Sequence, residues 1–92
     1  MDSYEIRWKR SAEQDVRGIE QHHIFRIIEA IEAIEPLADN PFPPQCHKLR
    51  GAQNLYRIRI GDYRVIYRIE SRKKTVIIYY IRHRKKVYKK LK

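Results

Sequence analysis

The segment 55–69, LYRIRIGDYRVIYRI, alternates apolar and polar side chains on both sides of the dipeptide Gly61-Asp62. Alternation with a period of two is the pattern of a β-strand, and glycine at the first position of a two-residue loop takes the positive φ of a tight hairpin turn. The segment therefore predicts a β-hairpin in which Ile60 pairs with Tyr63, and Arg59 with Arg64.

This hairpin has two chemically different faces. One is apolar and carries Tyr56, Ile58, Ile60, Tyr63, Val65, Tyr67 and Ile69. The other, here called the arginine face, carries Arg57, Arg59, Arg64 and Arg68. Like charges directly opposite each other destabilise a sheet by a few tenths to ~1 kcal/mol. We therefore expect the arginine face to bind an anion, and the phosphate of a nucleic acid is the strongest candidate.

The charge of the chain is divided unevenly between its two halves. Residues 1–46 hold 5 basic and 9 acidic residues, whereas residues 47–92 hold 16 basic and 2 acidic residues. A basic half joined to an acidic half produces a directed electric field, which favours a polyanionic partner. A solvated basic surface without a partner is the alternative interpretation.

Several classes of protein and site are disfavoured by the sequence. Cys46 is the only cysteine, so no internal disulfide can form, which fits a cytoplasmic location. The N-terminus lacks the apolar run of a secretory signal, and no stretch reaches the ~20 apolar residues of a membrane helix. Cys46 and His47 have no partner pair at zinc-type spacing, and there is no Gly-rich phosphate loop, so we expect no metal and no cofactor.

Local patterns predict the remaining elements. Residues 4–8 alternate as a first strand. Ser11 is the expected N-cap of a first helix, with Gln14 completing a capping box. Residues 75–82 form a last strand, and because their apolar side chains occupy both faces we expect a central strand covered on both sides. A second helix that ends near Pro36 is predicted by a stripe at helical spacing, which we expect to face the core: Ile24, Ile27, Ile28, Ile31 and Ile34.

The order strand, helix, helix, strand, strand, strand predicts a single α+β domain that spans residues 1–92. The two helices pack on the apolar face of a mainly antiparallel four-stranded sheet. Residues 40–45 and 47–55 are expected to be loops. In this arrangement the arginine face stays open.

Two basic segments converge in the predicted fold, namely the hairpin and the end of the last strand. The end of the last strand and the tail after it supply Arg82, His83, Arg84 and Tyr88. Lys48 and Arg50, just before the hairpin, extend this basic surface. Arginine binds phosphate through a planar fork and stabilises the charge of a phosphoryl-transfer transition state. RNA carries its own nucleophile, the 2′-hydroxyl, so cleavage requires a base, an acid and positive charge, and His83 and Tyr88 are suited to proton transfer. The alternatives are phosphate binding without chemistry, a surface histidine, and a tyrosine that covers the sheet edge.

The runs KLRGAQNLYRIRIGDYRVIYRI and VIIYYIRHRKKVY, together with NPFP, resemble the RelE/ParE superfamily of toxin–antitoxin toxins, and its RelE branch in particular. This resemblance covers nearly the whole chain, residues 4–88. It implies the microbial-RNase-like α/β fold and an mRNA endoribonuclease that cuts in the A site of the 70S ribosome, by attack of the 2′-hydroxyl on the adjacent phosphate. It also implies a cognate antitoxin, expected to be acidic, and contact with operator DNA only through that antitoxin.

The resemblance also implies roles for single residues. Arg57 and Arg59 fall where members of the family carry strand lysines, and Arg64 falls on the phosphate-binding arginine. Arg84 matches the transition-state arginine, with which Arg82 is able to exchange roles, and Tyr88 matches the terminal tyrosine. Because arginine effectively cannot lose a proton, His83 is the expected base. The expected RNA-binding residues are Lys48, Arg50, Arg68, Arg82, Lys85 and Lys86.

The same fold serves two other functions that remain open from the sequence. One is ParE-like inhibition of DNA gyrase, and the other is nucleic-acid binding without catalysis. The cluster of basic and aromatic residues favours the nuclease over both.

Overall fold

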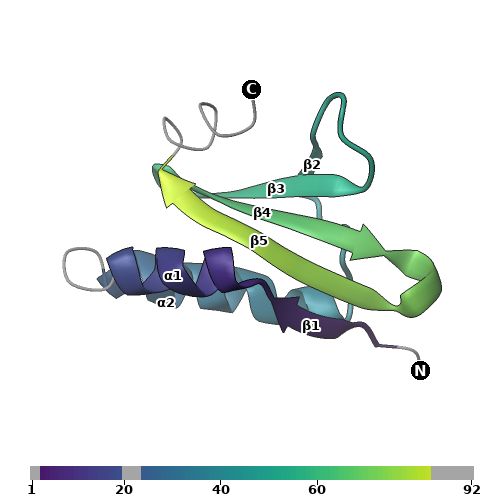
Figure 1. The fold of residues 1–92 in the computed structure, drawn as a ribbon, viewed down its shortest axis with the longest axis horizontal. Coiled ribbons are helices and arrows are strands. Elements are labelled where there is room, and N and C mark those ends of the chain that lie inside the picture. Colours follow the sequence, from purple (N-terminus) through teal and green to yellow (C-terminus); the bar gives the residue numbers. More distant parts are fainter. Residues whose placement is uncertain (1–2, 20–23, 84–92) are drawn as a thin grey trace.

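The computed structural model describes residues 3–19 and 24–83. Its elements are β1 (Glu5–Trp8), α1 (Arg10–Ile19), α2 (Ile24–Ile34), the 3₁₀ helix η1 (Glu35–Ala38), β2 (His47–Lys48), β3 (Leu55–Ile60), β4 (Tyr63–Glu70), the 3₁₀ helix η2 (Ser71–Lys73) and β5 (Thr75–His83). The strands form one sheet in the order β1-β5-β4-β3-β2, and both helices lie on the same side of it (Figure 1).

The predicted α+β architecture is confirmed. All strand pairs are antiparallel except β1 and β5, which are parallel. The described sheet has five strands rather than four, because His47 and Lys48 pair with β3 where a loop was expected. A strand of two residues is too short to show an alternating pattern, so only the pairing with an existing edge reveals it.

The hairpin has the predicted register. Ile60 pairs with Tyr63, and Arg59 with Arg64. Gly61 has a φ of 59°, so the first turn residue adopts the left-handed conformation that favours glycine. The apolar face of the hairpin lies against the helices, where Ile58, Val65, Tyr67 and Ile69 are buried together with Ala12, Ala30 and Ile34.

Helix α2 forms as predicted, but it is rotated relative to the expected stripe. Ala30 and Ile34 are buried, whereas large side chains remain exposed on the solvent side: Ile24, Phe25, Ile28 and Ile31. Most residues of α2 are apolar, so the pattern of isoleucines does not select one face, and small Ala30 permits the close approach to the core. Although this strip is apolar, no helix in the described part of the chain is long and apolar enough to cross a membrane.

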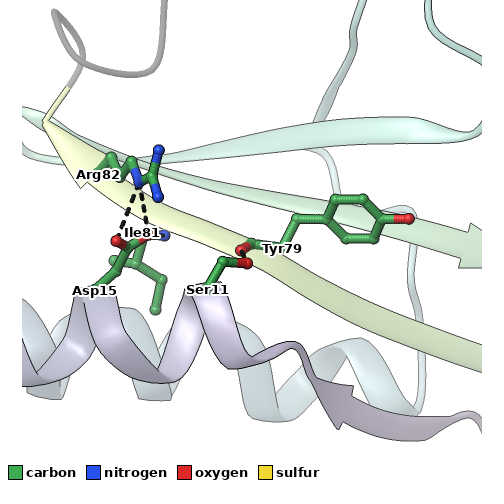
Figure 2. A network of polar contacts seen from close by, with 5 residues as sticks. All are labelled: Ser11, Asp15, Tyr79, Ile81 and Arg82. Atoms are coloured by element: carbon green, nitrogen blue, oxygen red, sulfur yellow. Dashed lines mark hydrogen bonds and ion pairs between the residues drawn. The ribbon is translucent and has the colours of Figure 1, made fainter. Parts of the chain in front are cut away.

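The start of helix α1 differs from the predicted capping box. The helix begins at Arg10, and the carbonyl of Lys9 accepts hydrogen bonds from the amides of Ala12 and Glu13 at 3.0 and 3.1 Å. Ser11 is therefore not the N-cap. Its hydroxyl instead donates a hydrogen bond of 2.6 Å to the carbonyl of Tyr79 on β5 (Figure 2).

An irregularity in β5 changes which side chains face the helices. The register between β4 and β5 shifts at Ile66 and Tyr67, which pair with Tyr80 and Ile78, so that Tyr79 is an extra residue on β5. Such a β-bulge reverses the alternation of faces beyond it. Ile78 and Ile81 are consequently both buried on the helix side, and the next residues change sides as well.

The expectation that the last strand is covered on both sides is wrong, because both helices lie on the same side of the sheet (Figure 1). β5 is a central strand, with β1 and β4 as its neighbours. On its helix side Val76, Ile78 and Ile81 are buried, but Tyr79 and Tyr80 on the other side are only half-buried. The second apolar face is therefore a partly open aromatic surface beside the arginine face.

Candidate nucleic-acid interface

Three arginines lie in one row across the open side of the sheet. Arg59 on β3 pairs with Arg64 on β4, and Arg64 pairs with Arg82 on β5. Residues that pair directly across strands share a face, so this arginine row extends the arginine face by one strand. Arg57 and Arg68 lie two and four positions away on the same face, next to the row. The sheet thus gathers guanidinium groups that repel one another in the absence of an anion.

Arg64 is the least compensated cation of the row. It is only 4 % exposed, and its Nη1 donates a long hydrogen bond of 3.3 Å to the carbonyl of Tyr63. Its Nε is buried and has no hydrogen-bond partner among the residues that the structure describes, and no ion pair is formed by Arg64 there. Burying a charge without a partner is costly, so this guanidinium is the strongest indication of an anion site.

Two of the neighbouring arginines, Arg82 and Arg68, have acidic partners. Arg82 Nε lies 2.9 Å from Asp15 Oδ2 on α1, and both side chains are largely buried. Arg68 Nε lies 3.6 Å from Glu70 Oε1. A hydrogen bond with the Tyr79 side chain, supported by the charge of Glu70, raises the pKa of Arg68 above its ordinary value. Within the arginine row, Arg64 is therefore the buried cation without a carboxylate partner in the described part of the chain, whereas Arg59 is exposed to solvent.

An aromatic ring completes the open surface. The guanidinium carbon of Arg82 lies 4.2 Å from the centre of the Tyr80 ring, and the rings of Tyr79 and Tyr80 are 6.3 Å apart in an edge-to-face arrangement. Aromatic rings beside arginines provide stacking surfaces for the bases of single-stranded RNA. Tyr80 was missed from the sequence because the bulge that places it on this side has no local signature.

Helix α1 secures the end of β5 that β1 does not reach. β1 pairs with β5 only as far as Ile78. Beyond that point Ser11 binds the carbonyl of Tyr79, and Asp15 Oδ2 accepts a 3.0 Å hydrogen bond from the amide of Ile81 (Figure 2). Asp15 also accepts the two hydrogen bonds from Arg82 Nε, at 2.9 and 3.0 Å. Asp15 thus satisfies a strand edge and orients Arg82, a contact between residues too distant in the sequence to predict.

Replacing Asp15 with Asn is expected to lower the free energy of unfolding by about 1.5–3 kcal/mol, because hydrogen bonds to charged groups are lost. Ser11→Ala is the matched control, since Ser11 binds the same strand edge without touching Arg82, and it is expected to cost about 1 kcal/mol. Urea unfolding followed by circular dichroism measures both variants. Equal losses for the two variants would show that the contact with Arg82 adds nothing.

His83 does not lie with the arginines, contrary to the predicted convergence. It pairs with Tyr63, and the two rings make an edge-to-face contact with centres 5.7 Å apart. Register therefore places His83 on the side of Tyr63 and Ile60, which faces the helices. Without the bulge the alternation of β5 would have put His83 on the arginine face and Arg82 on the helix side.

The other predicted site residues lie at the rim or outside the described part of the chain. Lys48 pairs with Tyr56, so register places it on the helix side, whereas its neighbour His47 pairs with Arg57. Arg50 is exposed in the β2–β3 connection, where residues 48–53 line an open pocket. Arg84, Lys85, Lys86 and Tyr88 lie outside the described residues. Within those residues no cluster of three or more His, Cys, Asp or Glu side chains is arranged to hold a metal ion.

Comparison with known proteins identifies relatives along nearly the whole chain. The profile of the family described as the ParE toxin of the type II toxin–antitoxin system parDE matches residues 6–88. A curated protein of Methanocaldococcus jannaschii that carries the provisional name toxin RelE1 is 38% identical over 61 residues, which cover 63% of this chain and 68% of that protein.

Solved structures of toxin–antitoxin complexes contain the same fold. The RelB–RelE antitoxin–toxin complex from Methanococcus jannaschii includes a chain with a TM-score of 0.70 and 26% identity, and the match covers 94% of this chain and 99% of that one. The RelBE2 toxin–antitoxin complex from Mycobacterium tuberculosis includes a chain with a TM-score of 0.67 and 27% identity, with 88% and 98% covered.

Proposed function

Because the chain belongs to the ParE toxin family of type II toxin–antitoxin systems, within the RelE/ParE superfamily, we propose that it is an mRNA endoribonuclease that acts in the A site of the ribosome. In this proposal the 2′-hydroxyl of one nucleotide attacks the adjacent phosphate, and the product ends in a 2′,3′-cyclic phosphate. The positive charge that stabilises the transition state comes from the protein itself, so the reaction requires no metal ion.

The buried guanidinium of Arg64 is the observation that carries this proposal. It faces the open side of the sheet with a donor that has no described partner, and Arg59 and Arg82 lie on either side of it. A phosphate bound there would relieve both the burial of an unpaired charge and the repulsion within the arginine row. Tyr80 offers a ring for a neighbouring base. Arg84 and Tyr88 are retained as proposed catalytic residues on the family resemblance alone.

The proposed partner of the free toxin is a cognate antitoxin with an acidic segment. The solved complexes of related toxins contain antitoxins. An acidic segment that lies on the arginine face would neutralise the same charges that RNA neutralises, so we expect antitoxin and RNA to compete for this surface. The exposed apolar strip of α2 gives such a partner a second, hydrophobic surface on the opposite side of the sheet.

Inducible expression followed by mapping of mRNA 5′ ends tests the proposed function. New ends confined to translated reading frames, absent when translation is blocked, are expected. Intact mRNA in growth-arrested cells would contradict the nuclease, and inhibition of purified DNA gyrase in a supercoiling assay would then favour the ParE-like alternative. Salt-sensitive RNA binding without cyclic-phosphate ends would favour a binding module without catalysis.

A further inference from the structure

One histidine in the described part of the chain shares a face with the arginine row. His47 on β2 pairs directly with Arg57 on β3 in an antiparallel ladder. Directly paired residues point to the same side of a sheet, with Cβ atoms about 5 Å apart. His47 is therefore on the arginine face, and its side chain is exposed.

The other described histidine of the basic half cannot take this place. His83 packs edge-to-face against Tyr63 on the helix side, and the bulge at Tyr79 fixes that orientation. The arginines themselves do not lose protons at physiological pH. Of the side chains that the structure places on this face, His47 is consequently the one suited to exchanging a proton near neutrality.

We propose that His47 is the proton-transfer residue of the arginine face, an inference that rests on the proposed nuclease function. Its neutral imidazole takes the proton of the 2′-hydroxyl as the oxygen bonds to phosphorus. The bond between phosphorus and the 5′-oxygen then breaks, and the imidazolium returns the proton to this leaving oxygen through a water molecule. One P–O bond forms, one breaks, and no proton is gained or lost.

The position of His47 relative to Arg64 is compatible with proton transfer by His47 and phosphate binding by Arg64. Adjacent strands are about 4.8 Å apart, so β2 lies about 10 Å from β4 with the strand of Arg57 and Arg59 between them. His47 lies in the row of Arg57 and Ile66, which is two residues along the strands from the row of Arg59 and Arg64. In this proposal a phosphate held by Arg64 and Arg59 has its ribose on the side of His47.

Arg57 and Arg59 are the charged groups that face His47 from β3, which is the strand paired with β2 in the described sheet.

Single-turnover cleavage of ribosome-bound mRNA by the full chain tests this role, with wild type, His47→Gln and His83→Gln compared. Glutamine keeps the size and polarity of the side chain but does not titrate. We expect His47→Gln to lower the cleavage rate at saturating enzyme by about 10²-fold or more, while RNA affinity and Tm stay at the wild-type values. His83→Gln is expected to stay within about twofold of wild type. Added imidazole is expected to restore part of the rate of His47→Ala.

The pH dependence separates proton transfer from simple RNA contact. The wild-type rate is expected to depend on pH, whereas the residual rate of His47→Gln does not show this dependence. Wild-type rate and pH dependence in His47→Gln would overturn the inference and leave the nuclease standing. A wild-type protein that does not cleave ribosome-bound mRNA would overturn the proposed function, and this inference with it.

Discussion

Replacing Arg64 with alanine is expected to lower the rate of ribosome-dependent mRNA cleavage by about 10²–10³-fold, the usual cost of removing one transition-state donor. Growth arrest on induction should be relieved to the same degree. We expect this large loss of rate because Arg64 is the buried arginine of the row without a described carboxylate partner. Its charge is therefore available to a ligand and is not neutralised by an ion pair within the described residues. Cleavage assays and growth curves measure the two effects.

Arg7→Ala is the matched control, because it removes the same charge from β1, an edge strand that β5 separates from β4. Arg7 is an exposed residue of β1 that pairs with Glu5, and its loss should leave cleavage and toxicity unchanged. A comparable loss of activity in Arg7→Ala would mean that total charge, rather than the arginine row, determines the effect.

A second measurement distinguishes a functional from a structural role for Arg64. Replacing a buried, unpaired cation by an apolar residue of similar length removes the cost of burying the charge. We therefore expect Arg64→Met to equal or exceed the wild type in free energy of unfolding while losing activity. A loss of about 2 kcal/mol or more in urea unfolding would show instead that Arg64 holds the sheet together.

Replacing Tyr67 with alanine is expected to lower the free energy of unfolding by about 3–5 kcal/mol, the cost of removing a large buried aromatic side chain. Tyr67 is fully buried, its ring stacks on Tyr56 with centres 6.0 Å apart, and its hydroxyl donates a 3.0 Å hydrogen bond to the carbonyl of Pro41. Because small domains have a total stability of about 5–15 kcal/mol, this single change removes a large part of it. Urea unfolding followed by circular dichroism gives the value.

The Tyr67→Phe variant separates the hydroxyl from the ring. Loss of the hydrogen bond to Pro41 is expected to cost about 1 kcal/mol at neutral pH, well below the cost of the alanine variant. Equal losses of unfolding free energy in the two variants would show that Tyr67 stabilises the fold through its hydrogen bond to Pro41 and not through the packing of its ring.

The pH dependence of Tyr67→Phe follows from the pKa of the hydroxyl. Burial, and next the hydrogen bond with Cys46, raise the pKa of Tyr67 well above its ordinary value. In the unfolded chain this tyrosine loses its proton near pH 10, so its contribution is complete below that pH and falls by about 1.4 kcal/mol per unit above it. We expect the advantage of wild type over Tyr67→Phe to disappear by about pH 11. A constant difference from pH 7 to pH 11 would contradict a buried, protonated hydroxyl.

The hairpin was predicted correctly in type, register and face because its information is local. Alternation over residues 55–69 and a glycine at the turn fix the pairing of Arg59 with Arg64 without reference to the rest of the chain. The existence of both helices and the central position of the last strand were also predicted. The roles assigned to single site residues remain proposals.

Two of the errors have the same physical source. Helix α2 is apolar around most of its surface, so its buried face is chosen by the fit of Ala30 and Ile34 into the core and not by the spacing of isoleucines. Ser11 was assigned to a cap because its competing partner, the Tyr79 carbonyl, is distant in the sequence. In both cases the deciding contact is tertiary.

The concentration of arginines on one side of a β-hairpin follows from the amino-acid sequence, because side-chain alternation is a property of the strand alone. Contacts between distant segments select the further residues that join them. One extra residue in β5, Tyr79, brings Arg82 to the arginine face and turns His83 away, and two residues of β2 add His47. A bulge and a short edge strand depend on hydrogen bonds offered by neighbouring strands, and those exist only once the sheet is assembled.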